Sequence, residues 1–182
     1  MQSKQFLCVL FGIFLTSIFD YNDAVVFKFT NVVCESYNQS WFVFHNCRLK
    51  AVSRNKVLFN FNGTILHPVN DIYIHGRIFK RATGYRPWLY DVTFDACQYL
   101  RKPNNPLIAM VYGLFKQYSN INHTCPYVGP QIIKDFYLRT DLMPLPWPTG
   151  DYLLSLQWIF DKKLQFDTNV SFVFVEDLIK KN

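Results

Sequence analysis

Glycine is scarce in this chain, and so are the motifs that use it. Only seven glycines occur in 182 residues, and none belongs to a glycine-rich loop or a G-x-S-x-G turn. Such loops cradle phosphates and such turns present a nucleophilic serine, so both kinds of site lack their usual framework. The cysteines form no C-x-x-C pair and the four histidines are scattered, which argues against a zinc centre. We therefore expect no metal and no cofactor.

No other side chains suggest catalysis. His45 and His75 fall inside expected strands, where histidine is more often structural than a ligand or a pH switch. Asp91 and Asp95 share one expected strand, and such carboxylates more often belong to a solvated face than to an acid–base pair. These patterns predict that the protein is not an enzyme.

Positive charge exceeds negative charge only moderately. The chain has 19 Lys and Arg residues against 13 Asp and Glu residues, for a net charge of +6. Most cations are spread thinly, and the one local group is loose; it consists of Arg77, Lys80, Arg81 and Arg86. Nucleic-acid surfaces usually carry a denser basic patch, so we expect no nucleic-acid partner and only a secondary attraction to acidic lipid headgroups.

The N-terminus carries the one long hydrophobic run that precedes the expected strands. The uncharged apolar run Phe6–Phe19 is too short to span a bilayer and is typical of a secretory signal peptide. No A-x-A pattern marks the cleavage site, which we place between Phe19 and Ala24. We expect a signal peptide at residues 1–22, a single domain at residues 23–182 and no stable membrane insertion; an uncleaved anchor is the alternative.

Four cysteines remain once the signal peptide is removed: Cys34, Cys47, Cys97 and Cys125. An even number in a secreted chain predicts a disulfide framework. Three pairings are possible, and we favour Cys34 with Cys47 and Cys97 with Cys125 because each pair brackets one compact unit. Loop-entropy arguments assign roughly 3 kcal/mol to the first disulfide and about 3.5 kcal/mol to the second.

Four N-x-[ST] sequons support the same compartment. They begin at Asn38, Asn62, Asn122 and Asn169. Four such sites behind a signal peptide indicate a glycosylated, secreted, extracellular protein. Because a glycan must lie in solvent, each of these asparagines is expected on an exposed face or in a loop.

Alternation of apolar and polar residues predicts about eight short strands. The runs occur at residues 25–34, 41–52, 56–66, 70–82, 88–100, 131–139, 152–161 and 170–175. The sequence ESYNQS separates the first two and suits a turn, which predicts a hairpin with Cys34 and Cys47 across it. Pro146, Pro148 and Gly150 form the turn that precedes the seventh run.

One segment changes to the helical period. Within residues 104–120, Asn105 and Pro106 suit the capping and first-turn positions, and apolar residues follow at helical spacing. Gly113 falls inside this amphipathic helix, where it lowers the helical propensity. Many antiparallel strands, polar turns and one short helix together predict an all-β sandwich.

The aromatic content is high for such a sandwich. The chain has 18 phenylalanines, 11 tyrosines and 4 tryptophans. Many of them alternate onto the apolar faces of expected strands: Phe29, Phe59, Phe61, Phe94, Trp158, Phe160, Phe172 and Phe174. Sandwich layers normally lie about 10 Å apart. The rings therefore either interdigitate as a solid core or line an apolar pocket between separated sheets, and alternation alone leaves both open.

Several segments resemble a known family. The stretches YRPWLYDVTFDACQYL, NHTCPYVG and LMPLPWPTGDYLLSLQW resemble an insect family of small secreted proteins of unknown function that includes CheB-type chemosensory proteins. That family in turn resembles the ML lipid-recognition superfamily, whose members are immunoglobulin-like β-sandwiches with sheets splayed around a lipid. Many ML proteins tie the final strand to the first with a late cysteine, and this chain has none after Cys125.

The resemblance and the inward aromatic residues together predict a lipid-sized cavity. Its expected walls are Phe59, Phe61, Phe94, Leu154, Leu156, Trp158, Phe172 and Phe174. The expected function is that of a secreted, monomeric carrier for a lipid or another hydrophobic small molecule in chemosensory or pheromone response, with a cell-surface receptor as a further candidate partner. The alternative is an extracellular protein–protein interaction module with a solid core and no cavity.

Overall fold

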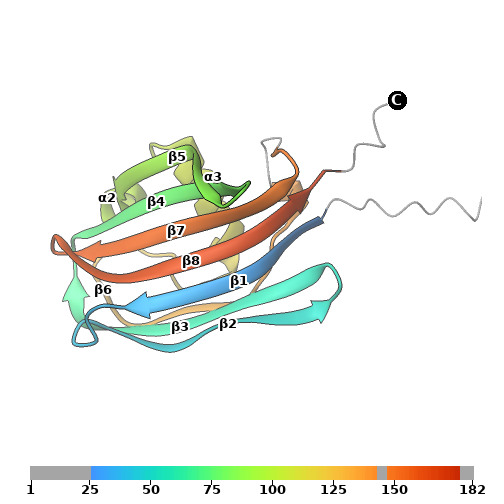
Figure 1. Cartoon of the computed structure of the whole chain (residues 1–182). Helices are drawn as coiled ribbons and strands as arrows, with labels where there is room; N and C mark the ends of the chain where they lie inside the picture. Colours follow the sequence, from blue (N-terminus) through green and yellow to red (C-terminus); the bar gives the residue numbers. More distant parts are fainter. Residues whose placement is uncertain (1–25, 143–146, 177–182) are drawn as a thin grey trace, which may run out of the picture. The chain divides into compact units, whose positions relative to one another are not determined.

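The chain folds into two antiparallel sheets (Figure 1). The computed structural model describes residues 26–142 and 147–176. The eight strands are β1 (Val26–Ser36), β2 (Phe42–Ser53), β3 (Lys56–Val69), β4 (Ile72–Arg81), β5 (Tyr85–Asp95), β6 (Tyr127–Phe136), β7 (Gly150–Phe160) and β8 (Lys163–Val175). The expected signal peptide, residues 1–22, and Pro146 lie outside the described residues.

The order of the strands is that of an immunoglobulin-like sandwich. One sheet has the order β1-β8-β7-β4-β5 and the other the order β2-β3-β6. With β1 set aside, β2-β3-β6 corresponds to strands A-B-E of an immunoglobulin domain, and β8-β7-β4-β5 corresponds to G-F-C-C′. The expected all-β sandwich is therefore confirmed, and β1 is an additional strand at the edge of the larger sheet.

The expected hairpin between the first two strands is wrong. β1 pairs along its length with β8, whereas β2 pairs with β3 in the other sheet. Phe27 favours this arrangement because its ring packs edge-on against Phe172 at 5.7 Å and Phe174 at 5.9 Å. The connection between β1 and β2 thus crosses from one sheet to the other, and the Cys34–Cys47 disulfide links the two sheets at this edge.

The fifth strand ends earlier than its alternation suggests. The expected strand continued to Leu100, but β5 stops at Asp95 and α2 (Ala96–Arg101) follows. The Asp95 carboxylate accepts a hydrogen bond from the Gln98 backbone N–H at 2.8 Å, which caps the helix. Cys97 therefore lies on a helix, where it is buried and forms the disulfide with Cys125.

The expected helix is α3 (Pro106–Phe115), which continues into the 3₁₀ turn η1 (Lys116–Tyr118). Asn105 caps it by accepting hydrogen bonds from the backbone N–H groups of Leu107 at 3.0 Å and Ile108 at 3.3 Å. Other strands also differ from expectation at their ends, most of all β6, which begins at Tyr127, and β8, which begins already at Lys163. A second 3₁₀ turn, η2, spans Thr140–Leu142.

We expect Gly113→Ala to stabilise the protein by about 0.8–1 kcal/mol, because alanine has the higher helical propensity. Gly113 lies inside α3, and an added Cβ would meet nothing within 4 Å. Urea unfolding of the full chain measures the change. A destabilised variant would show that the backbone needs glycine here.

We expect the opposite sign for Gly63→Ala, with a loss of about 3 kcal/mol from overpacking. A Cβ on Gly63 would overlap the Phe42 ring, which is 1% exposed and stacked on Phe166 at 3.9 Å between ring centroids. Gly84→Ala is the matched control, since nothing lies within 4 Å of its Cβ position. Equal unfolding free energies for the two variants would contradict this packing argument.

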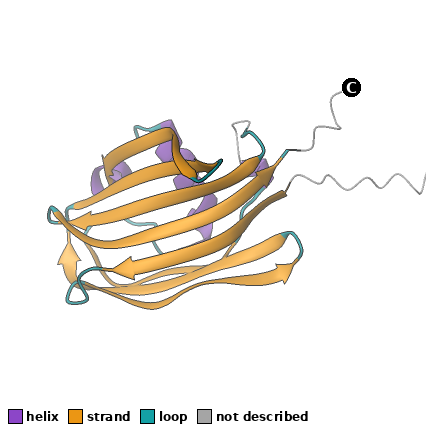
Figure 2. Cartoon of the chain, viewed as in Figure 1, coloured by secondary structure: helices purple, strands orange, loops and turns teal. Residues whose placement is uncertain are grey.

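The two edges of the sandwich are closed differently. At one edge β1 lies against both β2 and β3, so the sheets meet directly. At the other edge β5 and β6 are the outer strands, and the helices gather beside β4 and β5 (Figure 2). α2 contacts β4 and β5, and η1 contacts β6. We call this side, formed by α2, α3 and η1, the helical edge.

Candidate ligand-binding cavity

A partly open cavity of about 260 Å³ lies between the sheets and the helices. All eight strands and both α-helices contribute to its wall. Of the expected residues, seven line it: Phe59, Phe61, Phe94, Leu154, Leu156, Trp158 and Phe172. The eighth, Phe174, is not part of the wall; its ring lies against Phe27 in the packed core.

Direct contacts between the sheets occur on the β1 and β8 side. The Phe29 ring of β1 lies 5.9 Å from Phe59 and 5.2 Å from Phe136, which belong to the smaller sheet. Phe42 of β2 stacks on Phe166 of β8 at 3.9 Å. These rings interdigitate and fill the space between the sheets at this edge, as in a solid sandwich core.

At the helical edge, the connection between the sheets runs through the helices. Phe94 of β5 packs on Tyr99 of α2 at 6.2 Å, and Tyr99 packs on Tyr112 of α3 at 6.1 Å. Tyr112 packs on Phe115 at 5.5 Å, and Phe115 on Phe136 of β6 at 6.4 Å. A chain of aromatic rings thus replaces direct contact between β5 and β6, and the cavity lies where the helices hold the sheets apart.

The sequence prediction missed this helical part of the wall. Ten lining residues come from α2 and α3: Ala96, Tyr99, Leu100, Leu107, Ile108, Met110, Val111, Tyr112, Leu114 and Phe115. The apolar stripe of the expected helix was a usable signal, since such a stripe must pack against something apolar. It did not reveal that the stripe would face the inside of the sandwich.

The polar atoms in the wall are largely engaged with the protein itself. Trp158 Nε1–H donates to Thr168 Oγ1 at 3.0 Å, and the Tyr112 hydroxyl donates to the Ile121 carbonyl at 2.9 Å. The Tyr127 hydroxyl donates to the carbonyl of His123. Among the described residues that line the cavity, none is charged. Such a wall can enclose apolar groups but offers little to fix a polar one.

Burial keeps three tyrosines of the wall, Tyr99, Tyr112 and Tyr127, neutral at physiological pH. It raises the pKa of Tyr127 to about 12, and the neighbouring Tyr112 adds to this rise. Burial also raises the pKa of Tyr99 and of Tyr112. These three hydroxyl groups therefore bring no negative charge to the cavity near neutral pH.

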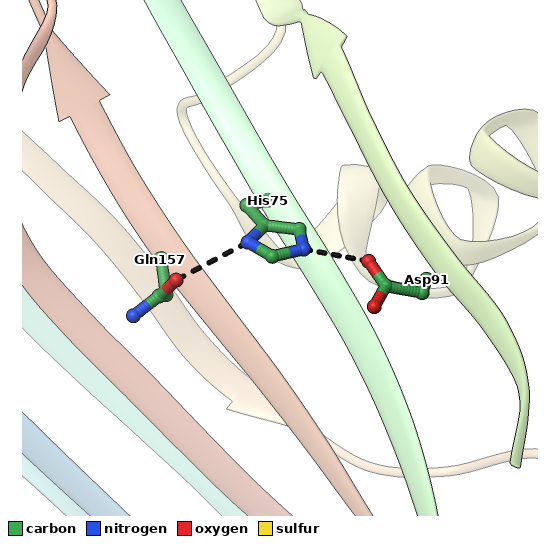
Figure 3. Close-up of polar contacts among 3 residues, drawn as sticks. All are labelled: His75, Asp91 and Gln157. Atoms are coloured by element: carbon green, nitrogen blue, oxygen red, sulfur yellow. Dashed lines mark hydrogen bonds and ion pairs between the residues drawn. The ribbon is translucent and has the colours of Figure 1, made fainter. Parts of the chain in front are cut away.

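A polar array on the outer face of the larger sheet is the strongest alternative site (Figure 3). His75 of β4 lies between Asp91 of β5, with Nε2 to Oδ1 at 2.6 Å, and Gln157 of β7, with Nδ1 to Oε1 at 3.2 Å. Because both ring nitrogens are engaged, neither is free to activate a nucleophile in this arrangement. The array connects three strands through partly exposed hydrogen bonds, as expected for structural residues.

The sequon asparagines lie on different parts of the domain. Asn122 is exposed in the segment between η1 and β6. Asn38 is partly exposed, and its side-chain oxygen accepts hydrogen bonds from the backbone and hydroxyl of Ser40. Asn62 and Asn169 lie within β3 and β8 and are partly buried, and Asn62 Oδ1 has no hydrogen-bond partner among the described residues.

Residues 26–142 and 147–176 contain neither a metal-binding cluster nor a membrane-spanning helix. No group of three or more His, Cys, Asp or Glu side chains there could hold a metal ion. No helix in these ranges is long and apolar enough to cross a membrane. The two disulfides formed by the expected pairs, Cys34–Cys47 and Cys97–Cys125, are typical of proteins from oxidising compartments.

Comparison with known proteins gives a family match over part of the chain. No curated protein matches the chain. The matching segment, residues 74–154, begins in β4, contains the whole helical edge and ends in β7, so it includes the part of the cavity wall that separates the sheets. Over this segment, the chain is similar to the family described as "Protein of unknown function (DUF1091)".

Proposed function

We propose that the protein is a carrier that encloses a hydrophobic small molecule or a lipid between its sheets. The observation that supports this proposal most is the cavity of about 260 Å³, whose wall has no charged residue among the described ones. Apolar clefts and cavities with few polar groups are the usual form of small-molecule sites. The protein acts by binding, without a chemical step.

The energetics of such binding are adequate without a polar anchor. Burying a methylene group gains about 0.8 kcal/mol. About ten methylenes would then supply roughly 8 kcal/mol, which corresponds to a micromolar dissociation constant. The hydrophobic effect alone therefore suffices for a carrier that must also release its ligand.

The resemblance to CheB-type insect proteins and to the ML superfamily suggests the setting. On this proposal the protein is secreted and glycosylated and carries a pheromone-like compound, and a cell-surface receptor could receive the ligand or the complex. The two disulfides and the sequons support an extracellular location.

The test is to purify the full chain from a secretory insect-cell host and examine it by native mass spectrometry and lipid extraction. Trp158, which lines the cavity, should report occupancy through its fluorescence when fatty alcohols or hydrocarbons are added. Trp158→Phe is the control, because it removes the Trp158 contribution but keeps an aromatic wall, and Trp147, which also lines the cavity, accounts for any response that remains. A protein that carries no extractable ligand and whose fluorescence does not respond would favour the interaction module instead.

A further inference from the structure

Positive charge collects at one end of the sandwich, although the sequence alone suggested that it is spread thinly. In the larger sheet, the turn between β4 and β5 lies beside the start of β7, because Lys80 pairs with Tyr152. The start of β7 pairs with the end of β8, which in turn pairs with the start of β1. There Lys28 of β1 donates a hydrogen bond to the Arg54 carbonyl in the turn between β2 and β3 (Figure 1). The two turns therefore lie at the same end of the domain.

We call this end, formed by residues 50–56, residues 80–86 and Lys28, the basic end. Its cations are Lys28, Lys50, Arg54, Lys56, Lys80, Arg81 and Arg86. The acidic residues close to it are fewer, namely Asp135, Asp151 and Glu176. Among the described residues, no cation of the basic end forms an ion pair with an acidic side chain. The charge of these cations is therefore available to a partner.

The opposite end of the domain has more acidic residues than cations. It is formed by the β1–β2 connection, the β3–β4 connection and the β7–β8 turn. Its acidic residues are Glu35, Asp71, Asp161 and Asp167, and its cations are Lys162 and Lys163. This asymmetry orients the domain so that its basic end approaches a negatively charged surface first.

Each turn of the basic end also exposes an apolar or aromatic side chain. Val52 is 57% exposed, and Tyr85 is 42% exposed. Lys50 and Arg54 lie two residues from Val52 on either side, and Arg81 pairs with Tyr85 across β4 and β5. Exposed apolar and aromatic side chains among cations are typical of surfaces that bind the interface of an anionic membrane. A soluble polyanion would need only the cations.

We propose that the basic end docks the protein on membranes that contain anionic phospholipids. The cations bind the negatively charged headgroups, and Val52 and Tyr85 enter the headgroup region. None of the four sequons begins in either turn, so no glycan is attached there. Docking does not require an occupied cavity. It would bring the cavity wall close to the membrane, because Ile78, which lines the cavity, precedes Lys80 by two residues of β4.

The experiment measures co-sedimentation of the full secreted chain with vesicles of phosphatidylcholine, with and without about 30% phosphatidylserine. We expect much tighter binding to the vesicles with phosphatidylserine, and its loss at about 1 M NaCl, where the Debye length is about 3 Å. A cation near an anionic membrane contributes about fivefold in affinity. The triple variant Lys50→Gln, Arg54→Gln, Lys56→Gln should therefore bind about a hundredfold more weakly.

The matched control is the triple variant Arg101→Gln, Lys102→Gln, Lys163→Gln, which loses the same charge from exposed positions outside the basic end. Its affinity should stay within about threefold of wild type, since charges beyond the Debye length of about 8 Å are largely screened. Val52→Asn keeps every cation and should weaken vesicle binding about tenfold by removing an apolar contact. Its binding to heparin, a soluble polyanion, should not change.

Equal losses in the two triple variants would overturn the docking, because net charge and not the basic end would then attract the vesicles. Equal binding to both kinds of vesicle would overturn it as well. Binding to heparin without binding to vesicles would identify a sulfated polysaccharide as the partner instead, and an unchanged Val52→Asn would exclude entry of Val52 into the headgroup region. Circular dichroism verifies that each variant is folded. Ligand binding, measured by Trp158 fluorescence without vesicles, tests the carrier function separately.

Discussion

Val92→Trp is expected to abolish ligand binding, lowering affinity by about a hundredfold or more. Val92 lines the cavity from β5, and its cross-strand partner is Gly76, which has no side chain to exclude a larger neighbour. Tryptophan adds about seven non-hydrogen atoms, which would project into the cavity and displace a similar number of ligand methylenes. Since each displaced methylene forfeits about 0.8 kcal/mol, little hydrophobic binding energy remains. Calorimetry with 1-nonanol measures the loss.

Thr93→Trp is the matched control. Thr93 is the next residue of β5, is exposed, and pairs with His75 on the outer face of the sheet. The same side chain placed there leaves the cavity unchanged, so we expect wild-type affinity. If Val92→Trp folds normally and still binds as well as Thr93→Trp, the ligand occupies another place.

Removing the Cys97–Cys125 disulfide is expected to cost about 3.5 kcal/mol of stability. The bond spans 28 residues and ties α2 to the segment before β6. It therefore restrains the helical edge, where the sheets are held apart by helices and do not meet directly. Denaturant unfolding of the double variant Cys97→Ala with Cys125→Ala gives the loss.

The Cys34–Cys47 disulfide provides the comparison. It spans 13 residues, so its removal should cost slightly less, about 3 kcal/mol. It lies at the edge where the sheets already interdigitate, and hydrogen exchange in α2 should stay slow in this variant. Exchange in α2 should become faster when Cys97 and Cys125 are replaced. An equal change in both variants would show that neither disulfide acts on one edge in particular.

The alternation of apolar and polar residues predicted well which side of a strand faces the interior. Alternation placed Leu154, Leu156 and Trp158 on one face of β7, and all three line the cavity. Alternation failed at the end of β5, where the sequence also contains the signal for the start of a helix. Asp95 followed three residues later by Gln98 is the pattern of a helix N-terminus, and this pattern outweighed the continued alternation of β5.

Other features depend on contacts between distant segments, which a local pattern does not contain. The turn after Cys34 was correctly placed, but turn residues do not determine whether the next strand pairs with its predecessor or crosses to a second sheet. The cavity also depends on contacts between segments that are distant in the sequence. The inward-facing rings leave a space because α3 lies between β5 and β6. The helical spacing of apolar residues in α3 predicts the helix but does not specify where it packs.

The pairing of β1 with β8 has a consequence for folding. Val26 pairs with Val175, so the first described strand is held by the last one. The larger sheet cannot be completed until nearly the whole chain is available, and closing so long a loop makes folding slow. Until then the aromatic faces of β1 and of the central strands are exposed to other molecules. We expect refolding from denaturant on a timescale of about milliseconds to seconds, in competition with aggregation that increases with protein concentration.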